Sequence, residues 1–166
     1  MTINIEVEKN LESDFDINEV AGLVIEEAID YVGCPYECEI NLLLTDNDEI
    51  RSINKEYRNI DKATDVLSFP MAEYERPGDF EGIEESQPDC FNPETGELIL
   101  GDIIISVDKV YEQAREYNHS IKREYAFLIA HSMLHLCGFD HMEADDAIIM
   151  EEHQKNILNK IRIFRD

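Results

Sequence analysis

Residues 120–141 read SIKREYAFLIAHSMLHLCGFDH, and both the fold and the chemistry of the chain follow from them. This stretch holds three of the five histidines of the chain, His131, His135 and His141. The apolar run that contains the first two predicts a helix, and Gly138 is the residue type at which helices commonly end in a left-handed turn. A spacing of four places His131 and His135 on one helix face, one turn apart. His141 can then approach them from the loop.

Histidines at offsets of zero, four and ten are typical of a catalytic zinc site. Neutral imidazole nitrogens bind Zn²⁺ at about 2.0–2.1 Å, and three of them leave one tetrahedral position open. The sequence therefore predicts one Zn²⁺ per chain, bound by His131, His135 and His141. The plainer alternative, three ordinary core histidines, would make their spacing an accident. Cys137 lies within the motif, but two residues after His135 it faces away from the ligand side of the helix.

The same spacing occurs in the metzincin proteases, whose motif is His-Glu-x-x-His-x-x-Gly-x-x-His. Those enzymes use the glutamate as a general base, and this chain has Ser132 in that place. A serine hydroxyl cannot take a proton from metal-bound water at neutral pH, so the general base of the protease is missing. The pattern predicts the metal site without the peptidase chemistry.

Length and composition indicate one protein domain. At 166 residues the chain is expected to form a single domain, residues 1–166, with a core of its own. No run approaches the roughly 18 apolar residues of a membrane helix, and the acidic N-terminus has no apolar signal region. We therefore expect a cytoplasmic location and no membrane partner. The four cysteines form no Cys-x-x-Cys pair and are expected to be reduced thiols.

The spacing of apolar residues predicts four strands and five helices. Strands are expected at about 3–7, 40–44, 65–70 and 98–107, and helices at about 16–33, 46–57, 108–117, 120–137 and 143–161. Asp16 and Asp46, each with a glutamate three residues later, are expected to open helices. A few strands followed by helices late in the chain predict an α+β fold. We expect one small mixed sheet of about four strands, with the metal site on a helix and the loop after it.

The chain is strongly acidic, and the acidic residues are unevenly placed. Its net charge is −24, from 38 acidic and 14 basic residues, which argues against non-specific binding to nucleic acid or to anionic membranes. Residues 73–97 alone carry nine acids and one base, together with three prolines and three glycines. This composition predicts a long, solvated and poorly ordered loop.

Several blocks of the chain resemble the YbeY family of metal-dependent endoribonucleases, also catalogued as rRNA maturation factors. The family pattern His-Gly-x-Leu-His-Leu-x-Gly-Tyr/Phe-Asp-His is similar to residues 131–141, with Ser132 in place of the usual glycine. A second block is similar to YRNIDKATDVLSFP at residues 57–70, and a third to LGDIIIS at residues 100–106. The approach to the metal helix, residues 119–128, resembles the family as well. The resemblance spans most of the chain.

This resemblance implies that the three histidines bind zinc and that Arg58 is essential for activity. A planar guanidinium can contact two phosphate oxygens at once, which suits the negative charge that develops during phosphodiester cleavage. Arg58 is therefore a candidate catalytic residue beside the histidines, the alternative being a surface arginine paired with Asp61. Asp65 could orient a ligand or could only cap a turn.

The family further implies a zinc-dependent, single-strand-specific endoribonuclease that acts on rRNA precursors, in 16S rRNA 3′ end maturation and ribosome quality control. The expected partners are single-stranded RNA and the ribosome or its small subunit, and no DNA is expected. Four basic residues are expected to line one side of the metal cleft, with the acidic loop facing elsewhere: Arg51, Lys55, Arg58 and Lys62. A zinc peptidase and a non-catalytic ribosome assembly factor with a structural metal are the alternatives.

Overall fold

The structure, a computed structural model, describes residues 1–141 and 143–163. The elements in chain order are β1 (Thr2–Val7), α1 (Ile17–Val32), β2 (Cys38–Thr45), α2 (Asn47–Arg58), β3 (Val66–Pro70), α3 (Ile83–Ser86), the 3₁₀ turn η1 (Pro88–Cys90), β4 (Leu98–Ser106), α4 (Val107–Glu116), α5 (Ile121–Leu136) and α6 (Ala144–Lys160). The strands form one sheet in the order β1-β2-β4-β3. Strands β1, β2 and β4 are parallel, and β3 runs antiparallel to β4. The predicted α+β fold with one small mixed sheet is confirmed.

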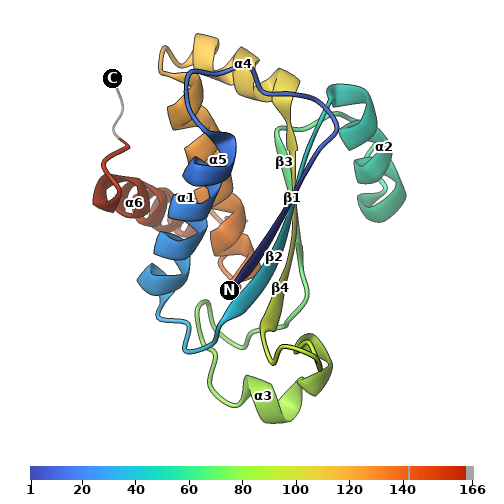
Figure 1. Cartoon of the computed structure of the whole chain (residues 1–166), viewed down its shortest axis with the longest axis vertical. Coiled ribbons are helices and arrows are strands. Elements are labelled where there is room, and N and C mark those ends of the chain that lie inside the picture. Colours follow the sequence, from blue (N-terminus) through green and yellow to red (C-terminus); the bar gives the residue numbers. More distant parts are fainter. Residues whose placement is uncertain (142, 164–166) are drawn as a thin grey trace.

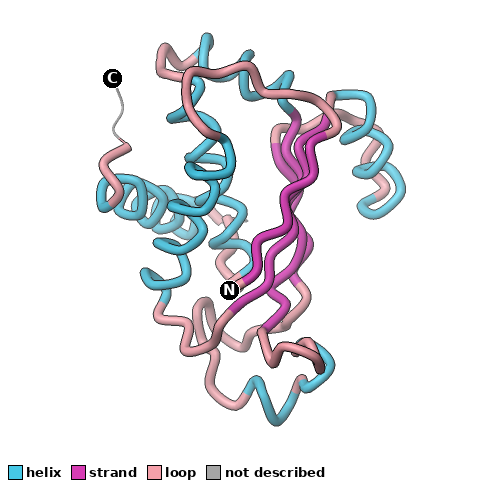
Figure 2. The backbone as a smooth tube through the Cα atoms, in the orientation of Figure 1, coloured by secondary structure: helices cyan, strands magenta, loops and turns pink. Residues whose placement is uncertain are grey.

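Helices cover the two faces of the sheet unequally. Helices α1, α5 and α6 lie on one side, and α2 lies on the other (Figures 1 and 2). The strand residues that face the larger layer are fully buried, among them Ile40, Leu42 and Leu44 of β2. A smaller apolar cluster of Ile50 and Leu67 forms under α2. The alternation of buried and less buried residues along β2 is the pattern that the sequence predicted for this strand.

Helix α5 lies at the centre of the larger layer. It packs against α1, α4 and α6 and against strands β3 and β4. Its middle is buried almost all round, from Arg123 to Ala130 with the exception of Phe127. This central position fixes the helix in the core, and its last two turns carry two of the predicted metal ligands. Within residues 1–141 and 143–163, no helix is long and apolar enough to cross a membrane.

The predicted helix starts are confirmed by their capping contacts. Asp16 accepts hydrogen bonds from the backbone N–H groups of Asn18 and Glu19, and Asp46 accepts one from Glu49. Ser120 does the same for Arg123 at the start of α5. Each cap satisfies an N–H group that has no partner within the helix.

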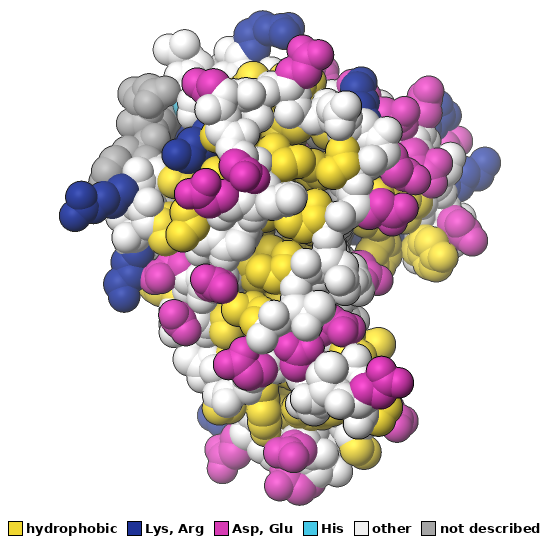
Figure 3. Space-filling view, viewed as in Figure 1, with side chains coloured by type: hydrophobic (Ala, Val, Ile, Leu, Met, Phe, Trp, Pro, Cys, Tyr) yellow, Lys and Arg dark blue, Asp and Glu magenta, His cyan; other side chains and the backbone are white. Residues whose placement is uncertain are grey.

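The acidic segment 73–97 differs from its prediction as a poorly ordered loop. It contains α3 and η1 and buries Phe80, Ile83 and Cys90. Its charged side chains remain outside, and Figure 3 shows acidic groups around the end of the molecule where α3 lies. The prediction was wrong because it weighed the charge of the segment and not its spaced apolar residues, which pack against the core.

The segment also does not face away from the metal motif. The Gly78 N–H donates to the carbonyl of Cys137 at 2.8 Å, in the turn between the second and third histidines. Tyr74 lies against Gly138 in the same turn. The acidic segment thus supports the turn that returns His141 toward α5.

Candidate metal centre and the cavity beside it

Three histidines converge at the carboxyl-terminal end of α5. His131 and His135 lie one turn apart on the helix, and His141 returns from the loop. The ring centroids are 4.6 Å apart for His131–His135, 4.8 Å for His135–His141 and 5.1 Å for His131–His141. One nitrogen from each ring lies within 4.8 Å of the other two, so the group could hold a metal ion.

Gly138 makes this return possible. Helix α5 ends at Leu136, and Gly138 has a φ of +95°, which residues with a Cβ rarely adopt. A Cβ there would lie 2.9 Å from the ring of Tyr74. The glycine at the predicted turn is therefore required both by the backbone angle and by the space.

Neighbouring groups contact the rings of the two helix histidines. Nδ1 of His135 lies 3.0 Å from the carbonyl oxygen of Phe139, and a carbonyl only accepts, so Nδ1 carries the proton and Nε2 keeps its lone pair. Burial lowers the pKa of His131, and a hydrogen bond with the Gln154 side chain opposes that shift.

The distance between the two helix histidines fits a shared ion. Their Nε2 atoms are 3.1 Å apart, and two such lone pairs repel each other unless a proton or a cation lies between them. Two nitrogen ligands of one tetrahedral Zn²⁺ are about 3.3 Å apart at usual bond lengths. Burial, followed by the two neighbouring histidines, lowers the pKa of His135 to about 4, which keeps the ring neutral at physiological pH. Neutral, oriented imidazoles are the form that binds a metal.

The third histidine leaves the site open to solvent. About half of the His141 side chain is exposed, whereas the first two rings are more deeply placed. The backbone N–H of His141 donates to Asp140 at 2.7 Å, so that carboxylate shapes the turn. A substrate can therefore approach the three nitrogens from the side of His141.

Ser132 occupies the place of the protease glutamate and is engaged elsewhere. It is fully buried, and its hydroxyl is hydrogen-bonded to that of Ser68 on β3. This contact joins α5 to the sheet. Ser132 therefore fills a packing position, and a longer acidic side chain would have to displace β3.

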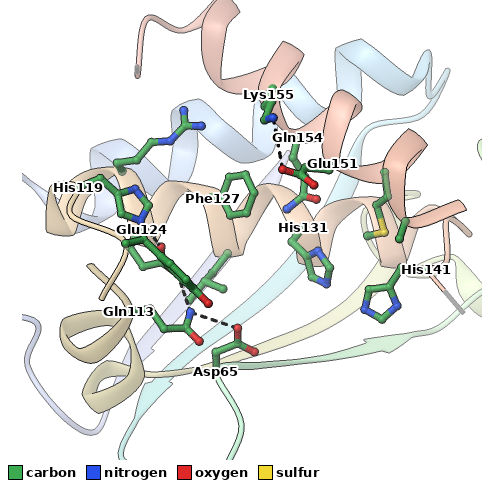
Figure 4. Close-up of a pocket in the computed structure, with 15 residues that line it drawn as sticks. Asp65, Gln113, His119, Glu124, Phe127, His131, His141, Glu151, Gln154 and Lys155 are labelled. Atoms are coloured by element: carbon green, nitrogen blue, oxygen red, sulfur yellow. Dashed lines mark hydrogen bonds and ion pairs between the residues drawn. The ribbon is translucent and has the colours of Figure 1, made fainter. Parts of the chain in front are cut away.

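A cavity of about 480 Å³ opens beside the histidines, between α4, α5 and α6 (Figure 4). His131 and His141 form one end of its lining. The other lining residues are Asp65, Gln113, Tyr117, His119, Arg123, Glu124, Phe127, Leu128, Ala147, Met150, Glu151, Gln154 and Lys155. The cavity is large enough for a small organic group.

A chain of polar contacts crosses the floor of this cavity. Gln113 donates to Glu124 at 2.6 Å and to Asp65 at 3.3 Å, and Glu124 lies 2.9 Å from Nε2 of His119 (Figure 4). Burial raises the pKa of Glu124, and the hydrogen bond from Gln113 opposes that shift. Asp65 also accepts from the N–H of Val66 at the start of β3. Asp65 thus belongs to this polar chain and orients Gln113.

The basic cluster predicted to line one side of the metal cleft does not line this cavity. Among the described residues that line the cavity, the cations are Arg123 and Lys155, and Arg58 is an exposed residue at the end of α2. Arg51 pairs with Asp61 at 2.8 Å, so the expected partner of a surface Arg58 is already taken. None of the four residues lines this cavity, since α2 packs on the opposite face of the sheet from α5, and their place along the metal cleft stays a prediction.

Sequence reasoning missed Gln154 as a neighbour of the site. It is buried in α6, and it follows Met150 by four residues and precedes Ile157 by three. Its position on the apolar side of a predicted helix could have identified it in the sequence, because a buried amide needs a hydrogen-bond partner.

Comparisons with known proteins agree with this arrangement. Residues 2–162 match the family model described as Endoribonuclease YbeY. Two relatives named Endoribonuclease YbeY, from Lachnoclostridium phytofermentans and Agathobacter rectalis, are 60% and 59% identical, each over 99% of this chain and 100% of the relative. A solution structure from Thermotoga maritima shares the fold, with a TM-score of 0.56 at 22% identity, covering 97% of this chain and 92% of the other. The chain belongs to the endoribonuclease YbeY family.

Proposed function

We propose that this protein is a metal-dependent endoribonuclease that cleaves single-stranded RNA. The observation that carries the proposal is the convergence of three imidazoles with two Nε2 atoms 3.1 Å apart. Membership of the family adds support, since relatives 60% and 59% identical bear the name Endoribonuclease YbeY. The partly exposed His141 gives a substrate access to the site.

His131, His135 and His141 are the proposed ligands of one Zn²⁺. When bound, the zinc would polarise the phosphate and lower the pKa of a coordinated water to about 7. The side chain of Gln154 and the carbonyl of Phe139 would hold two of the rings in the orientation that presents Nε2. These contacts make the site rigid before the substrate arrives.

Arg58 is the residue proposed to stabilise the charge of the scissile phosphate. It ends α2 as an exposed side chain, and in the complex its guanidinium would contact the non-bridging oxygens of the scissile phosphate. It would stabilise the extra negative charge in the transition state. Because α2 lies across the sheet from α5, the scissile phosphate would have to lie at the edge formed by β3 for the zinc and Arg58 to contact it together.

We further propose rRNA precursors as the substrate, with roles in 16S rRNA 3′ end maturation and in ribosome quality control. The small ribosomal subunit would then be a partner and the cytoplasm the location. Because the net charge of −24 opposes non-specific attraction of phosphates, such a substrate would have to be held by specific contacts.

Two other functions are less well supported. A zinc peptidase needs a carboxylate next to the first histidine, where this chain has the buried Ser132. A structural metal in a non-catalytic assembly factor would normally have four protein ligands, and the group found among the described residues has three.

The test is cleavage of one RNA sequence offered as a single strand and as a duplex, and of an unstructured peptide. The expected result is cleavage of the single strand alone, abolished by a chelator and restored by zinc. Arg58→Ala should lower kcat/KM by about 100-fold or more with metal content retained. Arg58→Lys should also be impaired, because an ammonium cannot make the two-pronged contact.

The matched control is Arg115→Ala, an exposed arginine in the last turn of α4, which should cleave normally. Cleavage of the peptide would support the peptidase. Absence of cleavage of any substrate by the zinc-loaded protein would favour the assembly factor. Normal turnover in Arg58→Ala would remove Arg58 from the mechanism.

A further inference from the structure

We propose that the cavity between α4, α5 and α6 binds the base of a nucleotide that flanks the scissile phosphate. This inference rests on the proposed RNA cleavage and names a subsite for it. His131 and His141 line the cavity at one end, so a phosphate at the three imidazoles would place its neighbouring base at the cavity mouth. At about 480 Å³ the cavity has room for a purine or a pyrimidine.

The charges in the cavity favour a neutral base over a phosphate. Three carboxylates line it, those of Asp65, Glu124 and Glu151. Lys155 is paired with Glu151 at 3.3 Å, and the guanidinium of Arg123 donates to the carbonyl of Ile163 at 2.6 Å. The two cations are therefore already engaged. A second phosphate would meet carboxylates, whereas the N–H groups of a base would find acceptors there.

Phe127 supplies a surface for stacking. Most neighbouring residues of α5 are buried, but the Phe127 ring is only partly buried and lines the cavity (Figure 4). The guanidinium of Arg123 lies 5.5 Å from the ring centroid. Tyr117 adds a second aromatic ring to the lining. Proteins commonly hold unpaired bases on such aromatic side chains.

Gln154 supplies an unused hydrogen-bond donor. Its side chain is 3% exposed, and its Nε2 has no hydrogen-bond partner among the described residues. Gln154 lines the cavity beside His131 (Figure 4), so this donor is within the proposed subsite. Buried donors are rarely left without an acceptor. A ring nitrogen or carbonyl of a base would satisfy this one, and it would link base binding directly to the histidine.

Abasic substitution tests the subsite on the zinc-loaded enzyme. Each nucleotide of a single-stranded substrate is replaced in turn by an abasic ribose, which keeps the phosphate and removes the base. At one of the two nucleotides that flank the cleaved bond, kcat/KM should fall by roughly tenfold, as expected for the loss of one stacked base. Unchanged kcat/KM at both flanking positions would overturn the proposal.

A matched pair of variants assigns the effect to the cavity. Phe127→Leu should lower kcat/KM on intact RNA by roughly tenfold. In this variant, removing the base of the sensitive flanking nucleotide should lower kcat/KM no further, because both changes remove the same stacking contact. Phe91→Leu changes another partly buried ring, which packs on Tyr36 outside the cavity, and it should leave the response to the abasic series intact. Equal responses in both variants would contradict the assignment.

A binding measurement separates this subsite from the proposed reaction. The metal-free protein is titrated with the four nucleoside 5′-monophosphates and with ribose 5-phosphate, and the side-chain amide resonance of Gln154 is followed by NMR. At least one nucleotide should shift that resonance, and ribose 5-phosphate should not. A shift without RNA cleavage would leave the subsite standing and overturn the nuclease. No shift with any nucleotide would overturn the subsite, even where RNA is cleaved.

Discussion

The two ends of helix α5 carry polar residues in opposite situations. At the amino-terminal end, buried Glu124 is contacted by Gln113 and by His119, and Arg123 donates to the carbonyl of Ile163. At the carboxyl-terminal end, the Nε2 atoms of His131 and His135 face each other at 3.1 Å. The first end is completed by the protein itself, whereas the three imidazoles at the second could hold an ion.

This difference separates two uses of polar residues on one helix. Polar groups that satisfy one another inside the chain hold the fold and shape the cavity floor. Imidazole nitrogens that converge on one point can instead share a cation, and binding the cation then stabilises the folded chain. The two ends should therefore respond differently to substitution: one through metal content, the other through stability.

The largest effect is expected for His135→Ala. Removing one of three ligands should reduce bound zinc from about one equivalent to nearly none after dialysis, because two imidazoles hold the ion poorly. The measurement is the metal content of the purified protein by mass spectrometry. His153→Ala is the control, since that ring contacts the Tyr31 hydroxyl and lies outside the three-histidine group. A full equivalent in His135→Ala would mean that the ligands are wrongly assigned.

The second largest effect is expected for Glu124→Ala, at the other end of α5. The substitution leaves Gln113 and His119 without their shared carboxylate, at a cost of about 3 kcal/mol in the free energy of unfolding. Urea denaturation of the two proteins measures it, and Glu124→Gln should recover part of the loss. Metal content should remain near one equivalent. Loss of zinc without loss of stability would erase the distinction between the two ends.

A smaller effect is expected in the turn that joins the second and third ligands. Gly138→Ala places a Cβ at a φ of +95° and 2.9 Å from Tyr74, which should cost about 2 kcal/mol and weaken zinc binding by displacing His141. Gly22→Ala, in α1 with open space around it, should be neutral or slightly stabilising. Thermal denaturation with and without zinc compares them. A zinc affinity of Gly138→Ala equal to that of the wild type would show that the turn does not position the ligand.

The smallest effect is expected for Ser132→Ala. It removes the hydrogen bond to Ser68 and should cost about 1 kcal/mol of stability, with zinc content and RNA cleavage unchanged. Ser132→Glu would instead force a carboxylate between α5 and β3 and should unfold much of the protein. A well-folded Ser132→Glu variant that cleaves peptides would contradict the placement of Ser132 away from the ion.

Local sequence patterns predicted most of the fold because the signals were local. The alternation in β2, the caps at Asp16 and Asp46 and the glycine after α5 each act within a few residues. The histidine group was predictable for the same reason, since two of its members share a helix face. Segment 73–97 was misjudged because its charge concealed the few apolar residues that anchor it.

Contacts between distant segments could not be read in this way. Gln154 meets His131 from a helix that begins after the motif, and Gln113 meets Asp65 across 48 positions of the chain. Which cationic side chains line the cavity is decided by the face of the sheet that each helix covers. That choice places Arg123 in the cavity and Arg58 at the end of a helix on the other side.

Anomalous X-ray diffraction at the zinc absorption edge, on crystals of the zinc-loaded protein, tests most directly whether the carboxyl-terminal end of α5 is completed by an ion. The account predicts one strong peak per chain, within about 2.0–2.1 Å of Nε2 of His131 and Nε2 of His135 and bound also by His141. A peak at another place, or a fully loaded protein in which the two Nε2 atoms face each other with no peak between them, would contradict it.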